Sequence, residues 1–198
     1  MKFLVVENNT VCEMADNPIA ANVITATTFA LGANLIAMLE ENGCHVAVTE
    51  QLAVAGSLSI EPEFAVIDSS IGPIMMITVS VINQLHVLLS SGQWSPEKRD
   101  IIYGELIVHE LQHIKQIHAG RMQQNNVTGA VTWDGVEWTA EQAAAIRYLD
   151  LPWERDACEV AAQWAVAKGY HKSFAEAWAA LEHNFATRGG LVTYREAA

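Results

Sequence analysis

The residues with the clearest chemical potential form one short motif, His109-Glu110-Leu111-Gln112-His113. Two histidines four residues apart share one face of a helix, with their Cβ atoms about 5–6 Å apart. Their imidazoles can therefore converge on one metal ion, at bond lengths of about 2.0–2.1 Å. Glu110 flanks such an ion instead of binding it, so its carboxylate can take a proton from a water molecule and pass it to a leaving amine. The motif predicts a hydrolytic metal site.

The alternative is an ordinary helix that carries two histidines by chance, because the motif is a short pattern. The apolar flanks of the motif and the polar residues gathered on the histidine face favour the metal site. Glu105 lies one turn before His109, and Gln116 lies one turn after His113. Either side chain can orient an imidazole from outside the ligand shell. His118 points away from this face of a continuous helix, so we expect it at the surface.

The motif resembles that of the zincins, a superfamily of HExxH zinc metallopeptidases, and the resemblance covers about residues 96–165. It implies a Zn²⁺ ion with three protein ligands and a fourth position for water. The metzincin branch would require glycine at 116 and histidine at 119. This chain has Gln116 and Ala119, which excludes that branch. In the gluzincin branch the third ligand is a glutamate on a later helix.

The resemblance assigns the third ligand to Glu154. The segment Pro152–Ala157 is similar to the Pro-x-Glu-x-x-Ala pattern that follows HExxH in small bacterial and phage zincin-like proteins. Ala157 and Ala161 share a helix face with Glu154, so this helix can approach the motif helix closely. An acidic residue in the first turn of a helix also has a purely electrostatic explanation, and the longer Asn-Glu-x-x-Ser-Asp pattern is missing. The other candidates are Glu159 first, and then Asp156, His171 and His183.

The helix that carries the motif has well-marked ends. Ser95 is a capping residue, Pro96 suits the first helical position, and Gly120 is typical of a helix end. These signals predict a helix over about residues 96–119. Apolar residues recur at helical spacing along it, which places the motif in the middle of a buried helix. They are Ile101, Ile102, Leu106, Val108, Leu111, Ile114 and Ile117.

Short strands and one long helix are predicted before the motif helix. Asn17-Pro18 is typical of a helix start and Gly43 of a helix end, which predicts a helix over 18–42. Residues 74–90 fit a strand, a helix, or one followed by the other. Strands are predicted at 2–6, 45–49 and 64–67.

After the motif helix the pattern changes to one β-hairpin followed by helices. Residues 127–138 predict a hairpin that turns at Asp134-Gly135. Thr139 and Gln142 form a capping box for a short helix to about Tyr148. Further helices are predicted from Pro152 to Gly169, and from a cap formed by Ser173 with Glu176 to Gly189.

These elements predict an α+β fold, a helix-dominated zincin-like domain with a small sheet and a β-hairpin. We expect one domain over residues 1–198, with an N-terminal part over 1–94 that holds a core helix and strands. Residues 95–198 would form the helical metal-site part. With 198 residues, of which 51% are hydrophobic, the chain can bury a core without disulfides.

Composition limits the partners of the chain. Its formal net charge of −12 repels phosphate backbones, and no basic stripe is present, so we expect no nucleic acid partner. Cys12, Cys44 and Cys158 lack metal-binding or disulfide spacing, which favours free thiols in a reducing compartment. Residues 3–6 are too short an apolar run for a signal peptide.

Two uncharged stretches, residues 19–39 and 69–96, are long enough to raise the question of a membrane span. The first contains asparagines and threonines, and the second is broken by Gly72-Pro73. We interpret both as buried core elements. The expected protein is soluble and cytoplasmic, without a membrane partner.

Other residues give weaker signals. Tyr148, Tyr170, His171 or His183 can stabilise a developing oxyanion. The tryptophans are expected in the core, although Trp133 and Trp138 on the hairpin can line a substrate cleft. In many zincins an edge strand holds the extended substrate, and here residues 45–49 or 64–82 are the candidates, with the hairpin as another wall of the cleft.

The sequence as a whole predicts a zinc metallopeptidase that acts on a peptide or protein substrate. Zn²⁺ would be bound by His109, His113 and Glu154, and Glu110 would be the general base. The first alternative is a zincin-like binding or structural protein, of the phage assembly type, with a structural metal. The second is a soluble protein without any metal.

Overall fold

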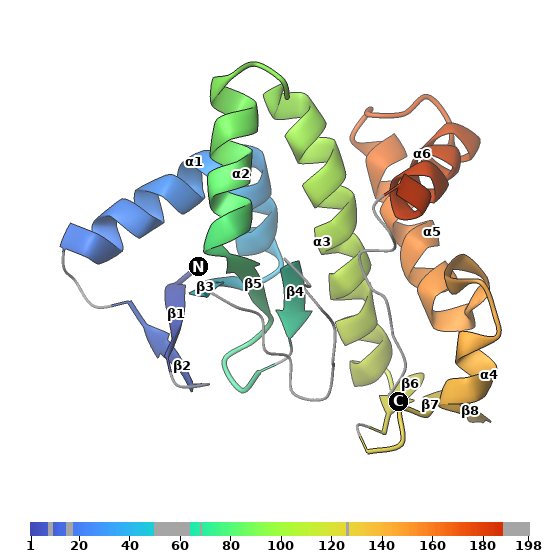
Figure 1. The fold of residues 1–198 in the computed structure, drawn as a ribbon. Coiled ribbons are helices and arrows are strands. Elements are labelled where there is room, and N and C mark those ends of the chain that lie inside the picture. The colour runs from blue at the N-terminus through green and yellow to red at the C-terminus, as the bar shows by residue number, and fades with distance from the viewer. Residues whose placement is uncertain (8–9, 15–17, 50–63, 68, 126, 188–198) are drawn as a thin grey trace. The chain divides into compact units, whose positions relative to one another are not determined.

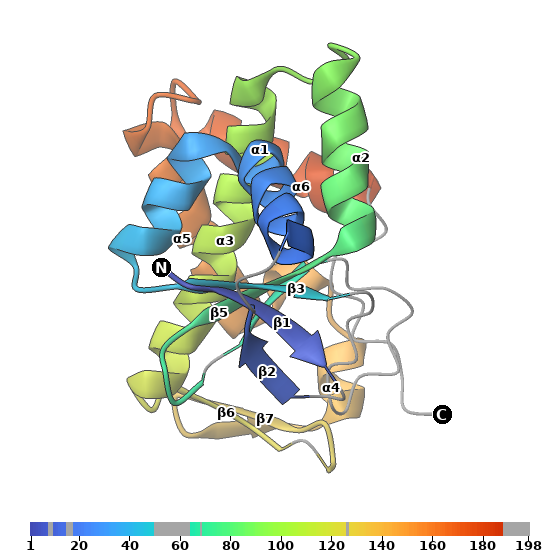
Figure 2. The ribbon, with the colours of Figure 1, turned by 90° about the vertical axis from the view of Figure 1, so that its left-hand side faces the viewer.

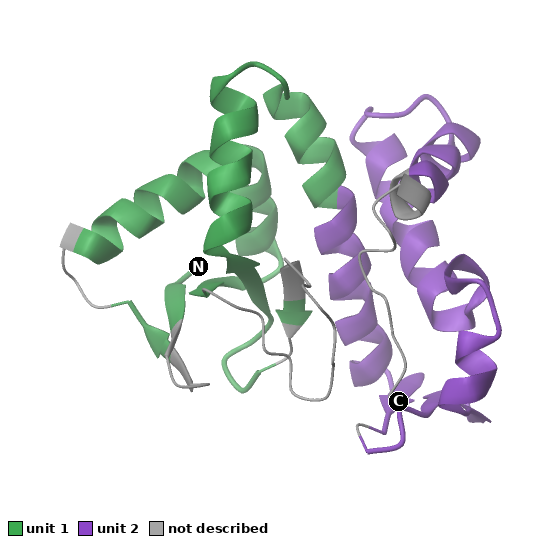
Figure 3. Ribbon diagram, in the orientation of Figure 1, with its two compact units in different colours: residues 1–53, 61–104 green, residues 54–60, 105–198 purple. Residues whose placement is uncertain are grey.

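The structure is a computed structural model, described here for residues 1–7, 10–14, 18–49, 64–67, 69–125 and 127–187. Its fold is α+β, as predicted, and consists of helices and two small sheets (Figure 1). The chain forms two compact units, residues 1–53 with 61–104 and residues 54–60 with 105–198 (Figure 3). The boundary between them lies inside helix α3, Pro96–His118.

Unit 1 is built on a five-stranded mixed sheet of order β2-β1-β3-β5-β4. The three central strands are parallel, and the two outer strands run antiparallel to their neighbours. The strands predicted at 2–6, 45–49 and 64–67 are confirmed, whereas β2 was not predicted because its short sequence mixes polar and apolar residues. The strands are β1 Phe3–Glu7, β2 Thr10–Glu13, β3 His45–Thr49, β4 Phe64–Ile67 and β5 Ile74–Thr78.

The segment 74–90 is a strand followed directly by a helix. All five residues of β5 are buried in the sheet. Thr78 then caps helix α2, Val79–Ser90, because its Oγ1 accepts a hydrogen bond from the backbone N–H of Val81 at 3.3 Å. α2 and the long helix α1, Pro18–Glu41, lie on the same side of the sheet (Figure 2). The helix predicted over 18–42 is therefore confirmed, while its expected cap Asn17 lies outside the described residues.

Helix α1 is kinked at Gly32, which has φ 72° and ψ 166°. The guanidinium of Arg99 occupies the place where a side chain at position 32 would stand. Arg99 donates to Asp100 Oδ1 from Nη2 at 2.6 Å and from Nε at 2.8 Å. Asp100 also accepts a hydrogen bond from Asn34 at 2.7 Å. A glycine at the kink thus makes room for a buried ion pair.

The two halves of α1 differ in exposure. After the kink, Leu35 and Leu39 are buried, whereas before it Ile19 is 76% and Phe29 is 48% exposed. The prediction that residues 19–39 form a buried core element is therefore wrong for the first half. By length and composition, Ile19–Glu41 is apolar enough to cross a membrane, with 28% of its most apolar window buried. The core helix of a soluble protein can have the same length and composition.

Unit 2 contains the second part of α3, a three-stranded antiparallel sheet of order β6-β7-β8 and four further helical segments. Ser95 caps α3 as predicted, since its Oγ accepts from the N–H of Lys98 at 3.0 Å. The predicted hairpin turn is also confirmed, because Asp134 and Gly135 both have positive φ, as a type I′ turn requires. The strands are β6 Met122–Gln124, β7 Val131–Trp133 and β8 Val136–Trp138.

The helices after the hairpin follow the prediction except at the first of them, and the predicted end of the last helix, Gly189, lies outside the described residues. The capping box of Thr139 and Gln142 is present, but helix α4 ends at Ala144 and a separate 3₁₀ turn follows. α4 buries no side chain, so no packing extends it, whereas Leu149 and Leu151 beyond it are buried. The elements are α4 Ala140–Ala144, η1 Tyr148–Asp150, α5 Pro152–Ala167 and α6 Phe174–Thr187.

The core of unit 2 has two clusters, one aromatic and one built from small residues. The aromatic cluster includes Trp133 and Trp153, which confirms their expected burial. Trp153 packs edge to face on Trp138, with ring centroids 5.8 Å apart. The second cluster joins α5 to α6 and contains Ala161, Ala162, Ala165, Ala177 and Leu181, with Val108 of α3 packed against it.

Candidate metal centre

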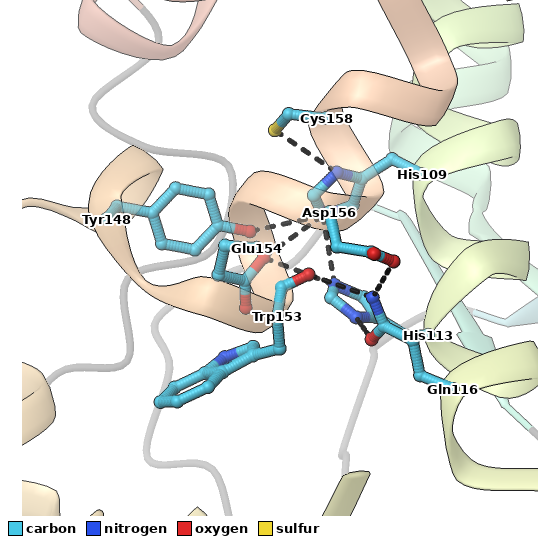
Figure 4. A network of polar contacts seen from close by, with 8 residues as sticks. All are labelled: His109, His113, Gln116, Tyr148, Trp153, Glu154, Asp156 and Cys158. Atoms are coloured by element: carbon cyan, nitrogen blue, oxygen red, sulfur yellow. Dashed lines mark hydrogen bonds and ion pairs between the residues drawn. The ribbon is translucent and has the colours of Figure 1, made fainter. Parts of the chain in front are cut away.

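Three side chains converge from α3 and α5 on one point (Figure 4). His109 and His113 lie one turn apart on α3, and Glu154 lies in the first turn of α5. The two Nε2 atoms are 3.0 Å apart, and Glu154 Oε2 lies 3.2 Å from that of His109 and 3.1 Å from that of His113. The side chains of His109, Glu154 and His113 are 3%, 2% and 15% exposed. The sequence prediction brought these three residues together correctly.

The chemistry of these atoms fits a metal ion. His113 Nδ1 lies 2.8 Å from Gln116 Oε1, so a neutral His113 donates its ring proton there and turns the lone pair of Nε2 toward His109 and Glu154. Lone pairs at such distances repel one another unless a cation lies between them. Two imidazoles and a carboxylate are ligands that proteins use for transition metals. The group can therefore hold a metal ion.

Without a metal ion, a proton can supply part of the positive charge that these three side chains need between them. Burial acts to lower the pKa of His113, but the hydrogen bond and charge of Glu154 outweigh it and raise the pKa to about 9. Burial acts in the opposite direction on Glu154, where the two histidines hold the carboxyl pKa well below its usual value. The buried pair is thus an imidazolium beside a carboxylate, and a metal ion would replace the proton.

Gln116 fixes the orientation of His113, as the sequence suggested. Its Nε2 donates to the backbone oxygen of Trp153 and to Asp156 Oδ2, each at 2.9 Å. These two acceptors settle which end of the amide is the oxygen, because an amide oxygen in that place would face two acceptors. The Gln116 oxygen must then face His113. The histidine is held in the tautomer that a metal ion at Nε2 needs.

Asp156 extends this chain of hydrogen bonds toward the hairpin. Gln112 donates to it at 2.9 Å, and Arg121 donates to its other oxygen at 3.1 Å. Burial acts to raise the pKa of Asp156, but hydrogen bonds from Gln116, Gln112 and Arg121 hold it below its usual value. Arg121 also pairs with Asp134 at 3.1 Å and lies over the ring of Trp133, 4.4 Å from its centroid. The ligand His113 is thereby linked to the small sheet.

The ring of His109 is contacted on both nitrogens. Tyr148 Oη lies 3.2 Å from Nε2, the atom that faces the other ligands. Cys158 Sγ lies 3.4 Å from Nδ1. Burial and the charges of Glu154 and Glu110 raise the pKa of Tyr148 well above its usual value, and the same causes raise the pKa of Cys158. Both groups are therefore uncharged.

Glu110 lies beside the three ligands without joining them. The residue is half-buried, and its charge acts on His113, Tyr148 and Cys158. Within the described residues, its carboxylate makes no hydrogen bond or ion pair. A carboxylate in this state is available to a water molecule, as the role of a general base requires.

The other ligand candidates lie elsewhere. Glu159 pairs with Arg155 at 3.1 Å on the surface, and Asp156 belongs to the hydrogen bonds described above. His171 Nε2 lies 3.5 Å from Oε1 of the buried Glu105, so this histidine meets Glu105 and not the ligands. His183 is exposed. Of the candidates for the third ligand, Glu154 is the one that the structure places with the two histidines.

The structure also distinguishes among the four residues predicted as oxyanion donors. Among them, Tyr148 lies within hydrogen-bond distance of a ligand atom, with its Oη 3.2 Å from His109 Nε2. Tyr170 packs against Trp164, with ring centroids 5.6 Å apart. The roles of Cys158 and Arg121 were not predicted. A signal for Cys158 existed, because it follows Glu154 by one helical turn.

Comparison of the chain with protein-family models, with curated proteins and with solved structures gives no match. No relative therefore contributes to the assignment of a function.

Proposed function

We propose that this chain is a zinc-dependent metallopeptidase of the zincin type. The proposal depends on one observation: three metal-binding atoms converge from α3 and α5, with the uncommitted carboxylate of Glu110 beside them. A structural metal site has no use for such a carboxylate, whereas hydrolysis requires a base at this place.

Zn²⁺ suits the group best among common metals. Two imidazole nitrogens and one carboxylate oxygen are a ligand set of catalytic zinc sites, which keep a fourth position for water or substrate. When bound, zinc supplies a Lewis acid that polarises the scissile carbonyl and lowers the pKa of water.

Side chains of the protein would carry out proton transfer, stabilisation of the oxyanion and binding of the ion. Glu110 would accept a proton from the attacking water and later donate it to the leaving amine. Tyr148 keeps its phenolic proton and lies next to the ligand atoms, so it would donate a hydrogen bond to the oxygen that gains negative charge. His109, His113 and Glu154 would hold the ion, and Gln116 would keep His113 in the required tautomer.

The order of the strands in the two sheets limits which strand can hold an extended substrate. β3, one of the predicted candidates, is paired on both sides, as is β5, so neither has a free edge to offer. The strands at the ends of their sheets are β2 and β4 in unit 1 and β6 and β8 in unit 2. β6 and β8 belong to the same unit as the ligands, and of these two β8 lies on the hairpin predicted as a wall of the cleft, with Val136 and Glu137 exposed. We therefore favour β8 as the strand that pairs with an extended peptide.

Metal content and peptide hydrolysis test the proposal together. We expect about one zinc per chain, lost in His109→Ala and in Glu154→Ala, by elemental analysis of the purified protein. His118→Ala and Glu159→Ala are matched controls, since these residues lie on the same two helices away from the ligands, and should keep the zinc. Glu110→Gln should keep the zinc and lose about 10²–10⁴-fold in the rate of hydrolysis of a peptide library.

A structural metal is the alternative, and the burial of His109 and Glu154, each 2% exposed, favours it. Wild-type protein that binds zinc but cleaves no peptide, and that loses its fold when zinc is removed, would support this alternative. Wild-type protein without zinc after reconstitution would overturn both functions.

A further inference from the structure

Helix α5 contacts both nitrogens of a single imidazole. Glu154 and Cys158 are four residues apart on α5 and therefore lie on one face of the helix. Glu154 Oε2 lies 3.2 Å from Nε2 of His109, and Cys158 Sγ lies 3.4 Å from Nδ1 of the same ring (Figure 4). Both residues of α5 are buried, with Cys158 at 0% exposure.

A histidine that binds a metal through Nε2 carries its proton on Nδ1, and that N–H needs a partner. Carboxylates, backbone carbonyls and water commonly fill this role. At Nδ1 of His109 the structure places a sulfur atom, which is a weak hydrogen-bond acceptor. The distance of 3.4 Å is suitable for an N–H···S contact.

We propose that Cys158 is a positioning residue of the metal centre, whose thiol holds the imidazole of His109 through its contact with Nδ1. The inference depends on the proposed metal site, but not on peptide hydrolysis. It gives His109 a partner on α5 just as Gln116 gives His113 a partner on α3. Each histidine is then held from its far side.

Cys158 is not itself a ligand in this arrangement. Its sulfur contacts Nδ1, whereas the other ligand atoms gather around Nε2 on the opposite side of the ring. A thiol also differs from a carboxylate in charge. The thiol supports the ring without adding another buried negative charge beside Glu154 and Glu110. It also accepts a weaker hydrogen bond from the Nδ1–H than a carboxylate would, so His109 stays a weaker electron donor to the metal.

Zinc affinity of the full chain, measured by competition with a chelator, tests the role. We expect Cys158→Ala to bind Zn²⁺ about 10–100-fold more weakly. Cys158→Ser, whose hydroxyl can accept the Nδ1 proton, should recover part of this loss. Cys44→Ala is the matched control: it also truncates a cysteine of 0% exposure, but in unit 1, and it should bind zinc as the wild type does.

A second measurement separates positioning from packing. In histidine-labelled, zinc-loaded protein, the ¹⁵N resonance of His109 Nδ1 should shift in Cys158→Ala and stay unchanged in Cys44→Ala. If Cys158→Ala binds zinc with wild-type affinity, or if Ala and Ser weaken binding equally with an unchanged Nδ1 resonance, the inference is overturned. Absence of zinc from the wild type would instead overturn the proposed function, so the two failures are distinguishable.

Discussion

At the scale of residues, the candidate metal centre depends on side chains outside the three proposed ligands. Gln116 is 1% exposed and uses both ends of its amide, accepting from His113 and donating to Asp156 and to the Trp153 carbonyl. Replacing a buried amide with this many partners should lower the stability of the fold, because each lost hydrogen bond leaves a buried polar group unsatisfied. Its replacement therefore affects the ligand and the fold together.

Gln116→Met tests this role, since methionine has a similar size and cannot reproduce the hydrogen bonds. We expect about 10–100-fold weaker zinc binding and about 1–3 kcal/mol less stability in urea unfolding, from the unsatisfied groups left behind. Gln112→Met is the control, because Gln112 donates to the same Asp156 without contacting His113. Equal zinc affinity of the two variants would show that Gln116 does not orient the ligand.

The part of the site that could be predicted from sequence is the part fixed by one helix. The spacing of His109 and His113 alone places their imidazoles together, and Gln116 follows by the same rule. Glu154 required a resemblance, supported by the alanines beside it. The contacts of Tyr148 and Cys158 depend on how α5 and the preceding 3₁₀ turn meet α3, which helical spacing does not determine.

At the scale of elements, the packing of α5 depends on small side chains, which join it to α6 and to Val108 of α3. Ala157, Ala161, Ala162 and Ala165 are all fully buried on α5. Hydrogen bonds also join α5 to α3, such as that from Gln116 on α3 to the Trp153 carbonyl on α5 at 2.9 Å. Since the ligands come from both helices, any change in their separation moves Glu154 relative to the histidines.

Ala161→Leu should push α5 away from α6 and from Val108 of α3, and so move Glu154 relative to the histidines. We expect a loss of about 1–3 kcal/mol in the free energy of unfolding, because extra methylenes in a packed core are not accommodated without strain. Zinc affinity should fall as well. Ala167→Leu, at the exposed end of the same helix, should change neither quantity. An unchanged zinc affinity in Ala161→Leu would mean that the ligands tolerate movement of α5.

Element boundaries were predictable where a local signal stands in the sequence. Ser95 and the capping box at Thr139 mark helix starts through contacts within four residues, and the structure contains both. β6 was missed because a three-residue strand shows too little alternation to be recognised. The kink at Gly32 was missed because its cause, the guanidinium of Arg99, is far away in the sequence.

At the scale of the whole molecule, all the residues of the metal centre lie in one of the two units. The ligands, Glu110, Tyr148 and the residues that orient the histidines fall between positions 105 and 158, inside unit 2. α3 contributes residues to both units. A bound ion acts on the stability of the segments that supply its ligands, so its effect should be largest in α5 and the second part of α3.

Removal of zinc should therefore raise the rate of backbone hydrogen exchange in α5 and leave the rates in the sheet of unit 1 unchanged. At a free zinc concentration of about 100 times the Kd, the ion stabilises the bound state by about 2.7 kcal/mol, and amides of α5 should exchange about 100-fold more slowly than after chelation. Amides of β3 and β5 in unit 1 should keep their rates. Glu154→Ala with zinc should match chelated wild type throughout. Equal slowing in both units would show that they open as one cooperative structure, with α3 as the element that couples them.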